Sequence, residues 1–259
     1  MRELTRMWGN TRLVVLTAMS ASLYAAILIP FKVLPIIPGV TEFRPANAVP
    51  VVCSFLFGPA GAWGAAIGNV IGDFFGGLGP GDAFGFVGNF LYGWVPYKAW
   101  RALTDADPLP GSVSGWIAFV VVVATAAGAC ALPIGWGLNL LGFVPFSVLG
   151  TIVFFNNFIV AVTLTPLLLA AIYPRVKRAG LRYEDIAPAD LRRPRAVRRL
   201  GLVLLVAAVL AGIVFGNLLS TGRLELPPLA TDPPGTRAAV VGVGLLPIIV
   251  LLFVGAFLL

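Results

Sequence analysis

The chain contains six separate apolar runs, each close to the roughly 20 residues that a helix needs to cross a lipid bilayer. They are 13–31, 83–100, 113–133, 146–173, 200–219 and 238–258. Only 11% of the residues are charged, whereas soluble domains carry about 25%. A helix satisfies its backbone hydrogen bonds within one segment, as the bilayer interior requires. The sequence therefore predicts an all-α integral membrane protein.

The stretch 45–76 is also apolar, but it is too long for one ordinary membrane helix and is interrupted by Gly58-Pro59. Proline removes a backbone donor and disfavours helix at the residue before it. This stretch can therefore form either one kinked helix or a hairpin of two helices, the first of them short. The choice decides on which side of the membrane every later segment lies.

The distribution of Lys and Arg decides between these alternatives. With a hairpin the chain has eight spans and both termini in the cytoplasm, and fourteen basic residues lie inside against four outside. With a single helix, the loop 174–199 and its nine basic residues would lie outside, against the positive-inside rule. We therefore predict the hairpin. The four outer basic residues are then Lys32, Arg44, Arg223 and Arg237.

The same basic segment divides the chain into three predicted parts. Residues 1–178 form a six-helix membrane bundle, 179–199 a basic cytoplasmic loop, and 200–259 a two-helix membrane hairpin. The loop is best explained as a topology determinant, which is compatible with binding to anionic lipid headgroups. Nucleic-acid binding is not expected, because the loop has one aromatic residue, Tyr183, and no recognisable module. The last two helices carry no ionisable residue and pack either against the bundle or against a partner.

Polar residues gather in the outer halves of the first six helices and in the adjoining loops, while the inner halves hold almost nothing comparable. Ionisable groups at membrane depth are costly and usually face a bundle interior or a water-filled cavity. We therefore predict an outward-opening, substrate-binding pocket. Its candidate contacts are Arg44, Asn47, Asn69, Asp73, Asp82, Asn89, Asn139, Asn156 and Asn157. Six aromatic residues at this level, Phe74, Phe75, Phe84, Phe86, Phe143 and Phe146, favour a flat, ring-containing ligand.

Each of these features also has a simpler explanation. Asp73 alone can be a cap near the membrane surface, and a lone membrane asparagine often only bonds a neighbouring helix. Glycines at four-residue spacing let helices approach closely, and we expect two such stripes to pack the third and fourth helices together. One stripe is Gly64, Gly68, Gly72 and Gly76, and the other is Gly81, Gly85 and Gly93.

Catalytic signatures are absent from the sequence. There is no histidine, which removes the usual general base and the commonest metal ligand. Neither the P-loop pattern G-x-x-x-x-G-K-[ST] nor G-x-S-x-G occurs. The two cysteines, Cys53 and Cys130, give neither a disulfide framework nor a metal site. We therefore predict no enzymatic activity, no metal and no cofactor, and a role in binding and transport.

The first helix carries a further face of small residues. Ala18, Ser22 and Ala26 form one series at four-residue spacing, and Ala21 with Ala25 forms another. Such a face lets another helix approach closely. On these residues alone, docking of a partner and packing within the bundle are equally good explanations.

Together these features resemble the substrate-binding S components of energy-coupling factor (ECF) vitamin transporters. The resemblance covers roughly residues 10–178, and its most specific parts are FGPAGAWGAAIGNVIGD at 57–73 and GDAFGFVGNFLYGWVPYKAW at 81–100. It implies a six-helix protein that binds a vitamin or related micronutrient near its outer face. It also implies pairing with a membrane T component and two cytoplasmic ATPases, and tilting to release the ligand inside.

The resemblance further implies that Ala21 and Ala25 contact the T component, with Ala18, Ser22 and Ala26 beside them. The last two helices depart from the family's six-helix plan. We therefore predict a multi-pass subunit of an ECF-type importer in the cell membrane, which binds a small heteroaromatic micronutrient. A self-sufficient secondary transporter or channel is an alternative, although no polar path continues through the inner half. A membrane-embedded metal-dependent enzyme using Asp73 and Asp82 is a further alternative, although the usual repeated acidic motif is absent.

Overall fold

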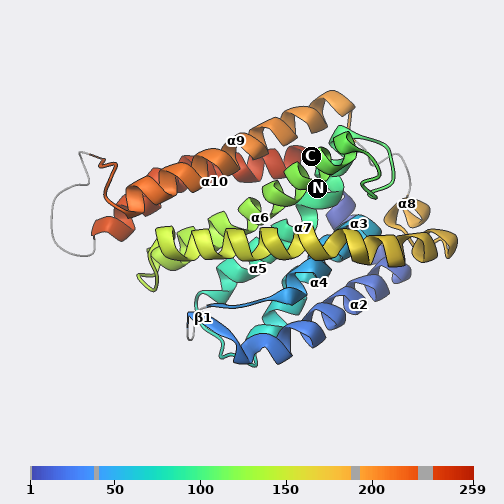
Figure 1. The fold of residues 1–259 in the computed structure, drawn as a ribbon, viewed down its shortest axis with the longest axis horizontal. Coiled ribbons are helices and arrows are strands. Elements are labelled where there is room, and N and C mark those ends of the chain that lie inside the picture. The colour runs from blue at the N-terminus through green and yellow to red at the C-terminus, as the bar shows by residue number, and fades with distance from the viewer. Residues whose placement is uncertain (1, 38–40, 188–192, 227–235) are drawn as a thin grey trace.

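The computed structural model describes residues 2–37, 41–187, 193–226 and 236–259, and helices make up most of it (Figure 1). The helices that correspond to the predicted spans are α2 (Thr11–Leu28), α3 (Ala48–Phe57), α4 (Pro59–Asp73), α5 (Asp82–Leu103), α6 (Val113–Leu140), α7 (Phe146–Arg178), α9 (Arg195–Ser220) and α10 (Thr236–Leu258). Two short helices, α1 (Arg2–Arg6) and α8 (Tyr183–Ile186), lie outside these spans.

Within the described residues, five helices are long and apolar enough to cross a membrane: α2, α6, α7, α9 and α10. Helix α5 has the length, with 22 residues, but it carries polar side chains at both ends. The two helices of the Gly58-Pro59 stretch are shorter, with 10 and 15 residues. The prediction of an all-α membrane protein is confirmed.

Helices α3 and α4 form a hairpin rather than one kinked helix. Gly58 joins them with φ 54° and ψ −121°, a conformation that favours glycine. Arg44, just before α3, donates from Nη1 to Oδ1 of Asn69 near the end of α4, at 3.1 Å. The start of α3 therefore lies beside the end of α4, which is the arrangement that the charge distribution predicted.

The glycine stripe of α4 packs against α2, and the expectation that it packs against α5 is wrong. A Cβ atom on Gly68 would lie 2.7 Å from the carbonyl oxygen of Ala21, and one on Gly72 would lie 2.5 Å from Leu28 Cδ2. Because both residue numbers rise together, α2 and α4 run parallel. The backbones of α2 and α4 therefore lie in close contact where Gly68 and Gly72 face Ala21 and Leu28. Gly76, the last glycine of the predicted stripe, lies beyond the end of α4.

Helix α5 approaches α4 through its own glycines, as expected. A Cβ atom on Gly93 would lie 2.7 Å from the Cα of Ala62, and one on Gly85 would lie 3.2 Å from Nδ2 of Asn69. Helix α4 is therefore held between α2 and α5, with a different face turned to each. Its polar residues near the end of the helix lie at the junction of the two contacts.

Helix α6 continues through Pro133 to Leu140, beyond the predicted span 113–133. Trp136 and Asn139 are therefore helical, whereas the predicted span would place them in an outer loop. A proline inside a membrane helix is tolerated where neighbouring groups compensate for the lost backbone bond. The extra turns bring α6 to α10, where Trp136 donates from Nε1 to the carbonyl oxygen of Gly242 at 2.9 Å.

The hairpin of α9 and α10 packs on α5, α6 and α7. Trp94 of α5 donates from Nε1 to the carbonyl oxygen of Ala256 at 2.8 Å, and Thr151 of α7 donates to Oδ1 of Asn217 at 3.2 Å. Figure 1 shows the hairpin at the opposite edge of the bundle from α2. Of the two explanations left open by the sequence, packing on the bundle is the one observed.

A small β-hairpin is a further part of the described fold that the sequence did not predict. Strands β1 (Pro35–Ile37) and β2 (Thr41–Glu42) pair antiparallel, with Pro35 opposite Glu42. With only three and two residues, they give no readable alternation of polar and apolar side chains. The hairpin lies between α2 and α3, on the same side of the bundle as the end of α4.

Residues near both ends of the chain meet at the opposite end of the bundle. Lys98 of α5 pairs with Glu3 of α1 at 2.8 Å, and Arg198 donates from Nη1 to the carbonyl oxygen of Arg101 at 2.7 Å. A Cβ atom on Gly201 would lie 2.8 Å from the backbone nitrogen of Leu259. This region, rich in Lys and Arg, is named the basic end, and charge asymmetry predicts that it faces the cytoplasm.

Candidate substrate-binding cavity

A cavity of about 1260 Å³, including its open mouth, lies between the ends of α4, α5, α6 and α7 that are remote from the basic end. Eight of the nine predicted contact residues line it: Arg44, Asn47, Asn69, Asp73, Asp82, Asn89, Asn156 and Asn157. They come from four segments of the chain: the stretch before α3, and α4, α5 and α7. The polar residues that the sequence places at a similar depth in the membrane therefore face one cavity. Ligand binding by these residues stays a prediction.

One wall of the cavity carries a row of three polar side chains. Arg44 donates to Oδ1 of Asn69 at 3.1 Å, and Asn69 donates from Nδ2 to Oδ2 of Asp73 at 2.6 Å. Asn69 is 1% exposed and Asp73 is 7% exposed. A buried charge needs compensation, and this row supplies donors to one side of the carboxylate. The four-residue spacing on α4 places both α4 side chains on the same face.

Asp82 lies at the start of α5, where Oδ2 accepts a hydrogen bond from the backbone nitrogen of Gly79 at 2.6 Å. This contact closes the turn that leads from α4 into α5. Asp82 therefore has a structural task at the rim in addition to lining the cavity. Asp73 is the more buried of the two carboxylates.

Three asparagines that line the cavity form its floor together with two tyrosines, Tyr24 and Tyr92, which bond to them from outside the lining. The hydroxyl of Tyr24 lies 3.0 Å from Oδ1 of Asn47 and 3.1 Å from Oδ1 of Asn89, so its single hydrogen is shared between two acceptors. Asn47 donates from Nδ2 to Oδ1 of Asn157, and Tyr92 donates to the backbone oxygen of Asn157 at 2.9 Å. These five residues, named the floor, tie together α2, the start of α3, α5 and α7.

Asn139 does not line the cavity, unlike the other eight candidates. Its Nδ2 donates to the carbonyl oxygen of Ala238 at 3.3 Å, and its Oδ1 accepts from the backbone nitrogen of Phe146 at 3.0 Å. The side chain thus joins the end of α6 to the starts of α7 and α10. This is the simpler explanation that applies to a membrane asparagine, namely bonding between helices.

The predicted aromatic residues divide into three groups. Phe75 and Phe143 line the cavity, where flat rings can cover a bound ligand. Phe146 is fully buried against glycines of α6, α7 and α9, and Phe84 packs edge-on against Trp136. Phe74 is 65% exposed, and Phe86 packs against Trp63 of α4. Only two of the six therefore meet the predicted site.

The sequence did not identify several residues that line the cavity or bond to its lining. Tyr24 was read only as part of the first helix, yet it contacts two of the predicted asparagines. Cys130, Ile134 and Leu138 give α6 a cavity face at four-residue spacing. That spacing was available in the sequence, but the surrounding residues are so uniformly apolar that no face stands out.

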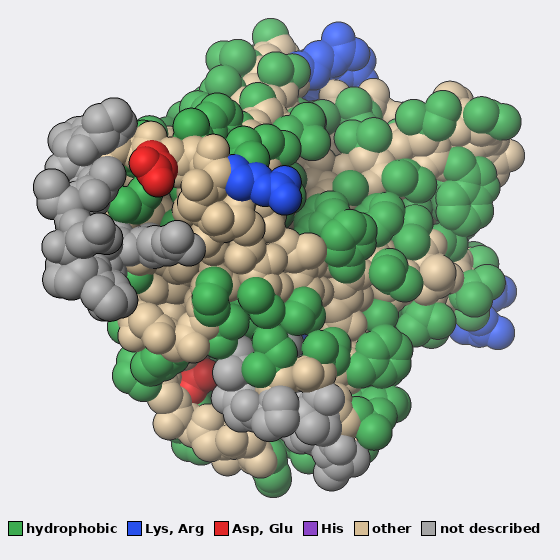
Figure 2. All heavy atoms as spheres, turned by 60° about the vertical axis from the view of Figure 1, so that its left-hand side comes forward, with side chains coloured by type: hydrophobic (Ala, Val, Ile, Leu, Met, Phe, Trp, Pro, Cys, Tyr) green, Lys and Arg blue, Asp and Glu red, His purple; other side chains and the backbone are tan. Residues whose placement is uncertain are grey.

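The charge of the lining favours a ligand that donates hydrogen bonds. Asp73 and Asp82 contribute two negative charges and Arg44 one positive charge, while asparagine amides both donate and accept. No group of three or more His, Cys, Asp or Glu side chains suited to a metal occurs among the described residues. The outer surface at this side of the molecule differs from the lining. Figure 2, in which the left-hand side of Figure 1 comes forward, shows many hydrophobic side chains on that surface and few charged ones.

The small-residue faces of α2 separate in the structure. Ala21 and Ala25 are each 3% exposed and lie within the bundle, where Ala21 meets the glycines of α4. Ala18, Ser22 and Ala26 are exposed on the other side of the helix. A partner could therefore reach the second series directly, and the first serves packing between α2 and α4. Contact with a T component stays a prediction for all five.

Comparison with known families points to transport. A family model described as QueT transporter matches residues 14–174, which is more than half of the chain. The matched region begins in α2 and ends in α7, so it contains every residue that lines the cavity and excludes α9 and α10. No curated protein and no solved structure matches the chain.

Proposed function

The chain belongs to the QueT transporter family, a family of ECF-type S components, and from this premise we propose that its cavity captures a queuosine precursor. The family is one of transporters and not of enzymes. The protein is therefore a substrate-binding transporter subunit and a multi-pass protein of the cell membrane. The identity of the ligand and of the partners is the part that we propose.

The convergence of eight predicted polar residues on one cavity carries the proposal for the ligand. Queuosine precursors are deazaguanine bases, which are flat and present adjacent N–H donors beside a carbonyl oxygen. The carboxylate of Asp73 can accept from such donors, and an asparagine amide can pair with the carbonyl and a further N–H. Phe75 and Phe143 offer ring faces for stacking.

Delivery into the cell requires partners in this proposal. The chain has no P-loop pattern, so a separate subunit must hydrolyse the nucleotide that powers uptake. We infer a membrane T component and cytoplasmic ATPases, as in other ECF-type importers. The exposed series Ala18, Ser22 and Ala26 on α2 is the face that supports close docking of a T-component helix.

Binding to the purified full chain tests the ligand directly. We expect a deazaguanine base to bind, guanine to bind more weakly, and adenine to fail, because adenine exchanges the donor and acceptor on its pairing edge. Isothermal titration in detergent measures all three. Equal affinity for guanine and adenine would contradict recognition of the pairing edge.

Uptake into proteoliposomes tests the need for partners. Purified protein alone should bind the base but not accumulate it, whereas the reconstituted complex with T component and ATPases should do so when ATP is enclosed. Accumulation by the protein alone, driven by an ion gradient, would instead establish the secondary transporter.

A further inference from the structure

A second cavity, of about 850 Å³ including its mouth, lies at the basic end and is separate from the substrate-binding cavity. Five basic side chains line it: Lys98, Arg101, Arg182, Arg193 and Arg198. Two acidic side chains, Glu3 and Glu184, line it as well. Among the described residues that line it, basic side chains therefore outnumber acidic ones. None of these residues lines the substrate-binding cavity.

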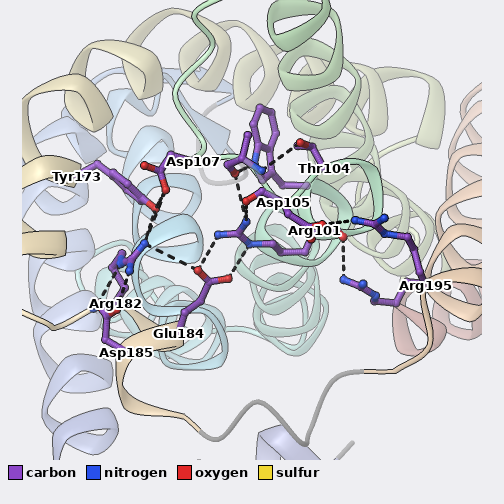
Figure 3. A network of polar contacts seen from close by, with 12 residues as sticks. Arg101, Thr104, Asp105, Asp107, Tyr173, Arg182, Glu184, Asp185 and Arg195 are labelled. Atoms are coloured by element: carbon purple, nitrogen blue, oxygen red, sulfur yellow. Dashed lines mark hydrogen bonds and ion pairs between the residues drawn. The ribbon is translucent and has the colours of Figure 1, made fainter.

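Carboxylates hold three of these cations in fixed positions. Lys98 pairs with Glu3 at 2.8 Å, Arg101 pairs with Glu184 at 2.7 Å, and Arg182 pairs with Asp185 at 2.7 Å. Figure 3 shows Arg101, Arg182 and Glu184 facing one another, with Asp107 and Tyr173 beside them. Glu3 comes from α1, Arg101 from α5 and Tyr173 from α7, so the cavity is assembled by tertiary contacts.

The remaining two cations enter from the segment around the start of α9. Arg198 donates from Nη1 to the carbonyl oxygen of Arg101 at 2.7 Å, which brings its guanidinium against α5. Arg193 lines the same cavity. Cations from α5, from the start of α8 and from the start of α9 therefore line one partly buried space.

The other walls of the cavity are apolar and aromatic. Phe55, Leu56 and Trp100 line it beside the cations, and Trp100 is 3% exposed. Side chains of this kind suit the glycerol and upper acyl region of a lipid, and tryptophan is typical of the membrane–water interface. The cavity thus combines cations for a phosphate with an apolar wall for what is attached to it.

We propose that this cavity binds the phosphate of an anionic phospholipid headgroup. Arginine is suited to phosphate because its planar guanidinium donates two parallel hydrogen bonds, and basic pockets between membrane helices on the cytoplasmic side bind anionic headgroups. The lipid would connect the start of α9 to α5 and α8. It would thereby fasten the hairpin of α9 and α10, at the basic end, to the bundle of helices within residues 14–174 that matches the family model. The proposal does not depend on the identity of the transported base.

Native mass spectrometry of the full chain tests the proposal, with phosphatidylglycerol or phosphatidylcholine added to the delipidated protein. We expect retention of phosphatidylglycerol in preference to phosphatidylcholine. The double variant Arg193→Gln/Arg198→Gln should retain phosphatidylglycerol about thirtyfold less tightly, given the usual contribution of two basic residues near a headgroup. Arg193→Lys/Arg198→Lys keeps the charge and should retain most of the binding.

The matched control is Arg175→Gln/Arg178→Gln, which removes the same charge from exposed arginines on the last turn of α7. Each of these contacts a carbonyl of its own helix, Ala171 and Pro174 respectively. This control should change retention by no more than about twofold, as expected for exposed charges. Should the cavity variant fail to fold, Arg193→Gln alone serves the same comparison.

Inorganic phosphate distinguishes the two possible sources of the anion. If excess phosphate neither raises the melting temperature of the lipid-free protein nor displaces the lipid, the headgroup is the ligand. If phosphate alone binds and the Gln variant abolishes its effect, the cavity is a site for a soluble phosphate compound and the lipid assignment is wrong. Equal retention of both lipids, or equal loss in the variant and its control, would overturn the site itself.

Discussion

Asn69 donates a hydrogen bond of 2.6 Å to Asp73, one helical turn further along α4, while its own amide oxygen accepts from Arg44. The amide thus stands between a cation and a carboxylate that belong to different segments of the chain. It orders both side chains on the wall of the substrate-binding cavity. Any ligand that donates to Asp73 meets a carboxylate whose orientation is already fixed, which lowers the entropic cost of binding.

Asp73→Asn should therefore weaken binding of a deazaguanine base about ten- to a hundredfold, the effect of losing a hydrogen bond to a charged acceptor. Isothermal titration of the purified variant measures it. Glu225→Gln is the matched control, because Glu225 is exposed and does not line the cavity. An unchanged affinity in a normally folded Asp73→Asn protein would make Asp73 a structural cap.

Gly68→Ala should destabilise the protein by about 1–3 kcal/mol, the usual cost of forcing extra atoms into a packed interior. A Cβ atom there would lie 2.7 Å from the backbone oxygen of Ala21, which cannot move without shifting α2. Gly79→Ala is the control, because no atom lies within 4 Å of its added Cβ. Thermal unfolding in detergent compares the two. Equal stability would show that α2 and α4 are not held in this close contact.

Ser22→Leu and Ala21→Leu should have different effects although the residues are neighbours. Ser22 is exposed and Ala21 is 3% exposed. We expect Ser22→Leu to abolish uptake by the reconstituted complex while base affinity stays unchanged, because it blocks close docking of a partner helix. Ala21→Leu should instead lower the melting temperature. Normal uptake by Ser22→Leu would remove this face of α2 from the partner interface.

The membrane orientation predicts that Arg178 and Glu225 lie on opposite sides. Both are exposed, so single cysteines at these positions should differ in their reaction with an impermeant thiol reagent. The background should be Cys53→Ala/Cys130→Ala, because Cys130 lines the substrate-binding cavity. In intact cells position 225 should react and position 178 should not. The reverse result would invert the topology.

Acidification should loosen the anchoring of α8. The hydrogen bonds from Arg182 hold the pKa of the Asp185 carboxyl below its ordinary value of 3.8. A lowered pKa means that the contact stabilises the fold above about pH 4 and is lost as the pH falls through the folded-state value. The protection factors of the backbone amides of residues 181–187 in hydrogen exchange should therefore fall below that pH. Asp185→Asn should show the faster exchange already at neutral pH, and unchanged protection would contradict this role.

Helix number and hairpin topology were predictable because hydrophobic length and charge asymmetry act over whole segments. The register between helices was not. The sequence shows that Gly64, Gly68 and Gly72 form a stripe, but a stripe fits any helix that presents a small or yielding face. Helix α2 meets it with Ser20, Ala21 and Leu28, a selection that depends on the packing of all helices together.

The sequence allowed most of the residues that line the cavity to be predicted, but not the contacts that each of them makes. A shared depth identified eight lining residues, because polar groups at that depth must face a cavity or each other. The same criterion included Asn139, whose partners on α7 and α10 appear only when α6 extends beyond Pro133. It omitted Tyr24, because a tyrosine in a membrane helix gives no sign of where its hydroxyl lies.

The floor of the substrate-binding cavity also bears on the permeability of the membrane. Its hydrogen bonds join Tyr24, Asn47, Asn89 and Asn157, and further along α5 the side chains of Leu91 and Val95 are fully buried. Leu91 and Val95 offer no polar group to an ion, so beneath the floor these two residues of α5 form an apolar barrier.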